Sequence, residues 1–148
     1  GAEARLRGVE VASEAPAEPL VVEGDPVHLQ QVVLNLLQNA FVAAADGAAP
    51  SEPRRISVIS ARAAGRATVA VSDSGPAVGE EVLASLFKPF FTTRADGLGM
   101  GLAISKRLVE AHDGRIWARR AGERGLVVGF DLPLSRLELP GRAAAAGA

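Results

Sequence analysis

The chain has 148 residues, of which 48% are hydrophobic and 22% charged, a composition typical of a folded globular domain. Its 16 Lys and Arg residues oppose 17 Asp and Glu residues, so the net charge of -1 argues against binding to nucleic acid. The absence of cysteine excludes disulfides, thiolate metal sites and thiol nucleophiles. The longest apolar run, residues 40–45, is far shorter than the roughly 20 residues that a membrane-spanning helix needs.

The two ends of the chain indicate its organisation. It begins with Gly1 and not with Met, so we expect a piece cut from a longer protein. Residues 6–11 and 20–22 are short strand candidates, separated by Pro16 and Pro19. Residues 140–148 contain only Pro, Gly, Arg and Ala. We therefore expect one domain over residues 1–134 and a disordered tail or linker over residues 135–148.

A long amphipathic helix is predicted next. Asp25 is a good N-cap, and Pro26 is favoured at the first helical position. The apolar residues then recur at helical spacing: Leu29, Val32, Val33, Leu36, Leu37 and Ala40. This stripe predicts a helix that ends near residue 47.

The remaining pattern predicts a mixture of hairpins and helices. Residues 56–60 and 67–71 read as strands joined by a tight hairpin, and residues 72–79 as a loop. Helices are expected over residues 80–87 and 100–112, and strands over residues 115–119 and 126–132. Because hairpins dominate, we expect the α+β class, with a mixed, mostly antiparallel sheet that carries helices on one face.

Two asparagines stand out within the long helix. Asn35 and Asn39 are one turn apart on the rim of the apolar face, although Asn disfavours a helix relative to Ala. A carboxamide oxygen is a suitable ligand for Mg²⁺ that keeps waters and phosphates as its other ligands. Two solvated polar residues beside the core remain the alternative.

A carboxylate and a glycine follow the second strand of the predicted hairpin. Asp73 would stand where this strand ends, and Gly75 would let a flat ring approach the backbone. A buried Asp there can accept a hydrogen bond from an amino group such as that of adenine. Asp-Ser-Gly-Pro is also ordinary turn chemistry, and this segment taken alone favours a turn.

Two further segments have unusual composition. The alternating glycines of residues 97–101 lead directly into a helix, which suits either a phosphate cradle or a flexible hinge. Residues 87–94 read Phe-Lys-Pro-Phe-Phe-Thr-Thr-Arg, a loop with apolar anchors and a terminal cation. This loop suits either a lid whose Arg reaches phosphate or a hydrophobic loop packed on the core.

The joint order of these motifs resembles the ATP-binding catalytic domain of sensor histidine kinases, a family related to the gyrase, heat-shock-ninety and mismatch-repair ATPases. The resemblance covers residues 25–132, and the Phe-Phe-Thr-Thr block followed closely by the glycine box is similar to the nitrogen- and oxygen-responsive kinases. It implies a Bergerat-type fold, a two-layer α/β sandwich with a mixed sheet on three helices. It also implies ATP and Mg²⁺ as cofactors.

Carried over by position, the resemblance implies that Asn39 coordinates Mg²⁺ and that Asn35 lies beside the metal and phosphates with a catalytic part. Asp73 would hold the adenine amino group, with Gly75 beneath the base. Arg94 stands where a lysine is usual and would contact phosphate with a catalytic part. The lid hinge and the remaining nucleotide contacts would come from Gly97, Leu98, Gly99, Met100, Gly101 and Leu102.

Two positions depart from the family pattern. Ala77 replaces the second glycine of the first glycine box, and if that position needs a positive φ, Ala costs about 1 kcal/mol and weakens nucleotide binding. Val42 stands where many relatives have a basic residue, so Arg94, Lys88 or Lys106 would have to supply the charge.

Neither histidine matches the phosphoacceptor motif of the family, so His28 and His112 are both expected to be structural. The resemblance then implies an acceptor histidine on a separate dimerisation domain, and a response regulator as the next partner. We expect a cytoplasmic domain, on the inner side of the membrane if the full protein is anchored, monomeric alone and homodimeric at full length. A degenerate, non-catalytic interaction module and an anti-sigma-factor-type serine kinase are the alternatives.

Overall fold

A computed structural model describes residues 2–6, 8–47, 53–90 and 101–135. Within these ranges the strands form one six-stranded sheet in the order β1-β2-β3-β4-β6-β5. The strands are β1 (Ala2–Leu6), β2 (Val9–Glu14), β3 (Arg55–Ala63), β4 (Arg66–Asp73), β5 (Arg115–Arg120) and β6 (Leu126–Pro133). The helices are α1 (Pro26–Gly47), α2 (Glu80–Ser85) and α3 (Gly101–Ala111).

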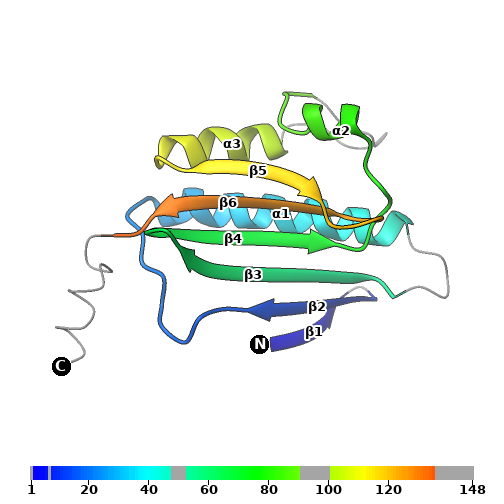
Figure 1. Cartoon of the computed structure of the whole chain (residues 1–148), viewed down its shortest axis with the longest axis horizontal. Helices are drawn as coiled ribbons and strands as arrows, with labels where there is room; N and C mark the ends of the chain where they lie inside the picture. Colours follow the sequence, from blue (N-terminus) through cyan, green and yellow to red (C-terminus); the bar gives the residue numbers. More distant parts are fainter. Residues whose placement is uncertain (1, 7, 48–52, 91–100, 136–148) are drawn as a thin grey trace.

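The elements form two layers (Figure 1). Helices α1 and α3 lie behind the sheet in this view, and α2 lies beyond the edge strand β5. Strand β2 pairs with β3 in parallel, and every other pairing in the described part of the sheet is antiparallel. The predicted α+β sandwich with a mixed, mostly antiparallel sheet is therefore confirmed.

Helix α1 begins and packs as its sequence predicts. The Asp25 Oδ1 atom accepts a hydrogen bond of 2.9 Å from the Val27 N–H, as an N-cap does. Every fourth residue along its inner side is buried in the core, at Val32, Leu36, Ala40 and Ala44. The apolar stripe thus points at the sheet, and the rim residues lie at the sides of the helix.

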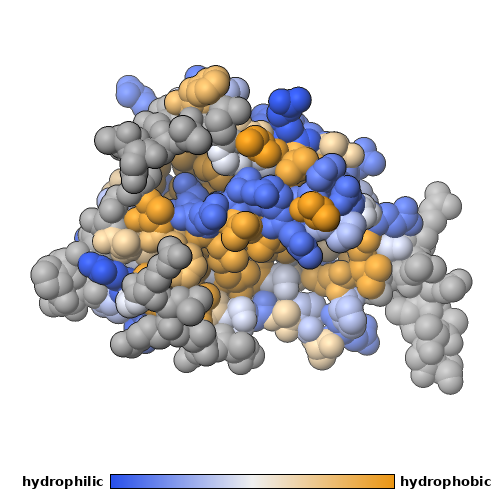
Figure 2. Space-filling model, turned by 180° about the vertical axis from the view of Figure 1, so that it is seen from behind, coloured by the Kyte–Doolittle hydropathy of each residue, from blue (hydrophilic) through white to orange (hydrophobic). Residues whose placement is uncertain are grey.

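The flank of α1 that faces away from Asn35 and Asn39 is a second apolar surface. Figure 2 shows the face that carries the helices, where hydrophobic side chains gather beside a hydrophilic band. A hollow of about 640 Å³ is lined there by Pro26, Leu29, Gln30, Val33, Leu34 and Leu37. At about 100° per residue, these positions lie across the helix from Asn35 and Asn39. The hollow is therefore separate from the asparagine side of α1.

The hairpin between β3 and β4 is also as predicted. Ala64 (φ 51°) and Gly65 (φ 76°) both have positive φ, the conformation of a two-residue type I′ turn. The register pairs Ala63 with Arg66 and Ile56 with Asp73. This register places Asp73 on the helix-facing side of the sheet, two residues beyond the buried Val71.

The strand predictions for the first 22 residues are wrong in detail. Residues 6–11 do not form one strand, because Gly8 (φ 75°) turns the chain between β1 and β2. Residues 20–22 belong to no strand, although the Val21 carbonyl accepts one hydrogen bond from the Ser135 N–H at 2.7 Å. The second strand of the sheet is instead β2, which overlaps the end of the first predicted segment and pairs with β3.

Two further predictions concern the chain as a whole. No helix in the described ranges has the length and hydropathy that crossing a bilayer requires. Strand β6 ends at Pro133, and of the predicted tail only Ser135 is described, so residues 136–148 lie outside the described residues.

Candidate functional site

Asp73 is a buried carboxylate at the end of β4. Only 7% of the residue is exposed, and its Oδ1 atom accepts a hydrogen bond of 2.8 Å from the Gly75 N–H. Burial raises the pKa of Asp73 above its ordinary value of 3.8, and the backbone N–H groups of Gly75 and Leu126 oppose that rise. The position suits a carboxylate that receives a further donor from a ligand.

Gly75 lies where no side chain fits. A Cβ atom there would come within 2.7 Å of the Ala43 carbonyl oxygen and 2.9 Å of Asp73 Oδ1. The segment after β4 therefore passes directly against the last turns of α1. Its glycine keeps the surface beside the carboxylate flat enough for a planar ring.

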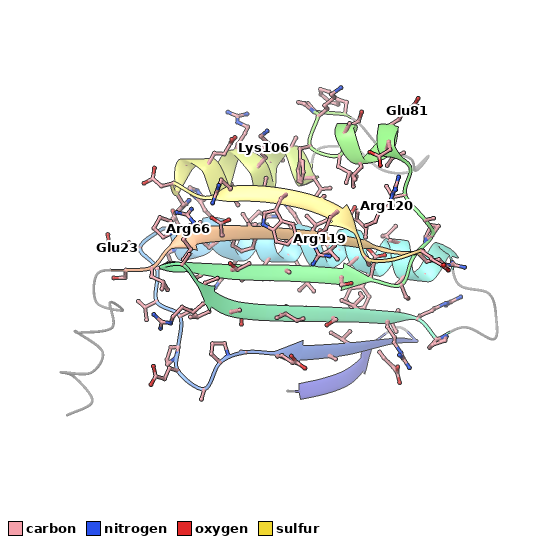
Figure 3. All side chains as sticks on the ribbon, viewed as in Figure 1. Glu23, Arg66, Glu81, Lys106, Arg119 and Arg120 are labelled. Atoms are coloured by element: carbon pink, nitrogen blue, oxygen red, sulfur yellow. The ribbon has the colours of Figure 1, made fainter. Side chains whose placement is uncertain are left out.

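The segment after β4 is fixed from β5 and β6 as well. The Arg120 Nε atom donates to the Val78 carbonyl at 2.8 Å, and its guanidinium pairs with Glu80 of α2 at 3.0 Å. In Figure 3, Arg120 projects from the end of β5 toward α2. Gly125 (φ 86°) lies against the Asp73 carbonyl, where a Cβ would collide with it. These contacts hold the Asp73 segment in place from two further elements.

Asn35 is buried, with 9% exposed, and joins α1 to α3. Its Nδ2 atom donates to the Gly101 carbonyl and to Ser105 Oγ, each at 3.0 Å, and its Oδ1 atom accepts from Gln31 Nε2 at 2.7 Å. Asn35, which the sequence places on the rim of the apolar face of α1, is thus part of the contact between α1 and α3. Asn35 is a residue that the sequence singles out, whereas Gln31 and Ser105 were not predicted.

Asn39 lies one turn beyond Asn35 on the same side of α1 and is half-buried. No hydrogen bond joins its carboxamide to another residue of the described ranges. One turn before Asn39, Asn35 binds α3, and one turn after it, the Ala43 carbonyl lies against Gly75. Positions 35, 39 and 43 follow one another at single-turn spacing, so Asn39 lies between the two segments that the sequence assigns to nucleotide binding.

The glycine-rich segment is described only from its last residue onward. Arg94, Gly97, Leu98, Gly99 and Met100 lie outside the described residues. Gly101 is the first residue of α3, and Leu102 is half-buried against the core. A Cβ at Gly101 would meet Asn35 Cγ at 3.9 Å, an ordinary contact, so space alone does not require glycine there.

The aromatic block divides between two environments. Phe87 is half-buried and packs against the core, whereas Phe90 is 76% exposed and has a positive φ of 63°. Phe91 lies outside the described residues. Lys88 and Lys106, the two other candidates for the missing basic charge, are both exposed.

Ala77 shows no sign of the strain that its replacement of glycine suggested. It is exposed, and it is not among the described non-glycine residues with positive φ, which are Ala64, Phe90 and Asp113. The cost of a left-handed Ala therefore does not arise at this position.

His112 connects the end of α3 to the start of α1. Its Nε2 atom accepts a hydrogen bond from the Asp25 N–H at 3.0 Å, and its Nδ1 atom lies 2.7 Å from the Leu108 carbonyl, so Nδ1 carries the proton. The ring of His28 meets the ring of His112 edge-on at 6.1 Å. These contacts support the structural role expected for both histidines.

Comparisons with known proteins identify the family. The family model described as histidine kinase-, DNA gyrase B- and HSP90-like ATPase matches residues 24–136. The sensor protein FixL of Bradyrhizobium diazoefficiens is 40% identical over 119 residues, which are 80% of this chain and 23% of FixL.

Solved histidine kinase structures share the fold. The nucleotide-free catalytic domain of the histidine kinase ThkA superposes with a TM-score of 0.72 at 35% identity, over 84% of this chain and 78% of that one. ThkA in complex with the response regulator protein TrrA superposes with a TM-score of 0.68 at 33% identity, over 87% of this chain and 35% of that one.

The family model matches most of the chain, which therefore belongs to the histidine kinase-, gyrase- and HSP90-like ATPases. Within the family it is an ATP-binding catalytic domain of the sensor histidine kinase kind. The chain spans about a quarter of the length of FixL.

Proposed function

We propose that this domain binds ATP with Mg²⁺ and presents the γ-phosphoryl group to a histidine on a separate dimerisation domain. The observation that carries the proposal is the arrangement along α1. The Asn39 carboxamide has no hydrogen bond to another described residue, and it lies between the Asn35 contact with α3 and the Ala43 contact with Gly75. A ligand that spans the two segments therefore passes over Asn39.

The described residues fit an adenine nucleotide. Asp73 offers a buried acceptor for the exocyclic amino group, and Gly75 leaves room for the ring beside it. Asn39 offers a neutral oxygen to Mg²⁺, a cation that commonly takes its other ligands from phosphates and water. Bound Mg²⁺ neutralises phosphate charge, which is much of what phosphoryl transfer requires.

The triphosphate side of the site is proposed from sequence alone. Asn35 would lie beside the metal and phosphates, and Arg94 would supply the cation that Val42 does not. The lid hinge and the remaining nucleotide contacts would come from Gly97, Leu98, Gly99, Met100, Gly101 and Leu102. None of these roles depends on a strained Ala77, so the degenerate, non-catalytic alternative loses its main argument.

The phosphoacceptor is proposed to lie in trans. Both ring nitrogens of His112 are occupied by contacts within the domain, and His28 lies in the first turn of α1. A response regulator would receive the phosphoryl group next, a proposal supported by the complex of ThkA with TrrA. The full-length protein would be a homodimer with this domain in the cytoplasm. Ser135 is buried against the domain, so the proposed tail or linker would begin at residue 136.

Calorimetric titration with a non-hydrolysable ATP analogue tests nucleotide binding. The wild-type chain is expected to bind the analogue in Mg²⁺ more tightly than in EDTA, and Asn39→Ala is expected to lose that difference. Binding by Asn39→Ala that responds to Mg²⁺ as the wild type does would remove Asn39 as the metal ligand. No binding at millimolar analogue would remove the proposed function.

Phosphoryl transfer separates the kinase classes. The chain is incubated with γ-labelled ATP and the dimerisation domain of its full-length protein. The account expects label on the acceptor that is lost in acid and retained in base, as a phosphoramidate is. Acid-stable label on a serine would favour the anti-sigma-factor-type alternative.

A further inference from the structure

The carboxamide of Asn35 has one orientation that satisfies its neighbours. The Oδ1 atom of Asn35 accepts a hydrogen bond of 2.7 Å from Gln31 Nε2. The Gly101 carbonyl can only accept, so it requires the Nδ2 atom at 3.0 Å. A flipped Asn35 amide would set its oxygen against the Gly101 carbonyl oxygen, two acceptors with no proton between them.

Ser105 completes this network. Its hydroxyl accepts from Asn35 Nδ2 at 3.0 Å and donates to the Gly101 carbonyl at 2.9 Å, so its proton and one lone pair are both in use. Ser105 has no exposed surface. Removing the Ser105 hydroxyl would leave one buried amide proton of Asn35 without its acceptor, and an unsatisfied buried donor lowers the free energy of unfolding.

The network lies beside the amide proposed to bind Mg²⁺. It ties α1 to the first residue of α3, one helical turn before Asn39. It therefore fixes both the spacing of the two helices and the orientation of Asn35 at the proposed phosphate side of the site.

We propose that Gln31 and Ser105 are positioning residues that act through Asn35 to preorganise the Mg²⁺–nucleotide site. This proposal rests on the proposed function, because it concerns how tightly the same site binds its nucleotide. Neither residue needs to touch the nucleotide.

Substitutions of the exposed Gln31 provide the first test. Gln31→Met removes the donor without adding charge, and Gln31→Glu replaces the donor by a carboxylate of the same shape. Both are expected to weaken binding of the Mg²⁺ complex of the non-hydrolysable ATP analogue about tenfold at pH 8, which corresponds to one net hydrogen bond. Gln30→Glu is the matched control, because it adds the same charge one position away, in the hollow that faces away from Asn35.

The pH dependence separates positioning from a merely structural role. A protonated Glu can donate as Gln does, so the deficit of Gln31→Glu relative to the wild type should narrow as the pH falls toward the ordinary range of Glu, about 4.3. The deficit of Gln31→Met should not narrow. Comparing each variant with the wild type at the same pH cancels titration of Asp73 and of the phosphates.

Ser105 provides the second test. Ser105→Ala is expected to weaken binding of the Mg²⁺ complex about tenfold, and Ser105→Thr, which keeps a hydroxyl able to bond the carbonyl four residues earlier, should recover most of it. Because both residues act through Asn35, Gln31→Met combined with Ser105→Ala should lose less than the product of the single losses. Should Ser105 variants fail to fold, the Gln31 pair alone decides.

The outcomes separate this proposal from the function on which it rests. If the wild type binds and Asn39→Ala does not, but every Gln31 and Ser105 variant binds within about twofold of the wild type, the positioning proposal is overturned alone. A Gln31→Glu deficit that Gln30→Glu reproduces, with Gln31→Met unaffected, also overturns it. If the wild type itself does not bind, the proposed function fails.

Discussion

Asp73→Asn removes the charge of the buried carboxylate without changing its size. The account assigns Asp73 the adenine amino group, and a hydrogen bond to a charged acceptor contributes roughly 1.5–3 kcal/mol. Since about 1.4 kcal/mol is a factor of ten, the variant should bind the Mg²⁺–ATP analogue roughly 10- to 150-fold more weakly at pH 7.5. Calorimetric titration of both proteins measures this ratio directly.

Asp73→Asn weakens nucleotide binding, but it should stabilise the fold relative to the wild type as the pH rises. Because the pKa of Asp73 is raised by burial, the native state holds this proton at pH values where the unfolded state has lost it. The free energy of unfolding therefore falls as the pH rises from 3.8 through the raised pKa, and it is level above it. Asp73→Asn lacks this slope, so its stability relative to the wild type should increase across that window.

Urea unfolding between pH 4 and 8 measures the stability, and nucleotide titration over the same range measures the affinity. Wild-type affinity should fall as Asp73 becomes protonated, whereas the affinity of Asp73→Asn should lack that dependence. Nucleotide affinity equal to the wild type, or a stability difference that is flat from pH 4 upward, would refute the reasoning about this carboxylate.

Three further substitutions test single contacts. Gly75→Ala should cost about 1–3 kcal/mol in urea unfolding and weaken nucleotide binding, because its Cβ would press on the Ala43 carbonyl; an unchanged midpoint would show that the contact yields. Ala77→Gly should change the Kd less than about twofold, because no strain is relieved, and should lower stability by about 0.4–1 kcal/mol through the unfolded chain; a large gain in affinity would contradict this. His112→Phe should lower the free energy of unfolding by about 1 kcal/mol, because it removes the acceptor for the Asp25 N–H, and nucleotide affinity should be retained. A variant as stable as the wild type would show that this hydrogen bond does not stabilise the fold.

The sequence predicted the elements whose signals are local. Helix α1 has both an N-cap at Asp25 and an apolar stripe along its length, and the hairpin after β3 has a glycine in a two-residue turn. The first strands were misplaced because the alternation near residues 6–11 runs through Gly8 without a visible break. The parallel pairing of β2 with β3 joins residues far apart in the chain, and no local pattern indicates it.

The residues of the candidate site also fall into two groups, those that the sequence singles out and those that it does not. Asn35, Asn39, Asp73 and Gly75 were predicted because amide, carboxylate and glycine stand out in their segments. Their partners were missed for two reasons: the Gly101 carbonyl, the Ala43 carbonyl and the Leu126 N–H are backbone groups without a side-chain signature, and Ser105 lies 70 residues from Asn35. Gln31 was detectable, because it lies one turn before Asn35.

A crystal structure of the domain with Mg²⁺ and a non-hydrolysable ATP analogue would show whether Asn39 and Asp73 hold the two ends of the bound nucleotide. The account predicts the Asn39 amide oxygen on the metal at about 2.0–2.1 Å, with the Asp73 carboxylate accepting from the adenine amino group. Nucleotide bound elsewhere, or Asn39 and Asp73 both without ligand contacts in crystals that contain the nucleotide, would contradict it.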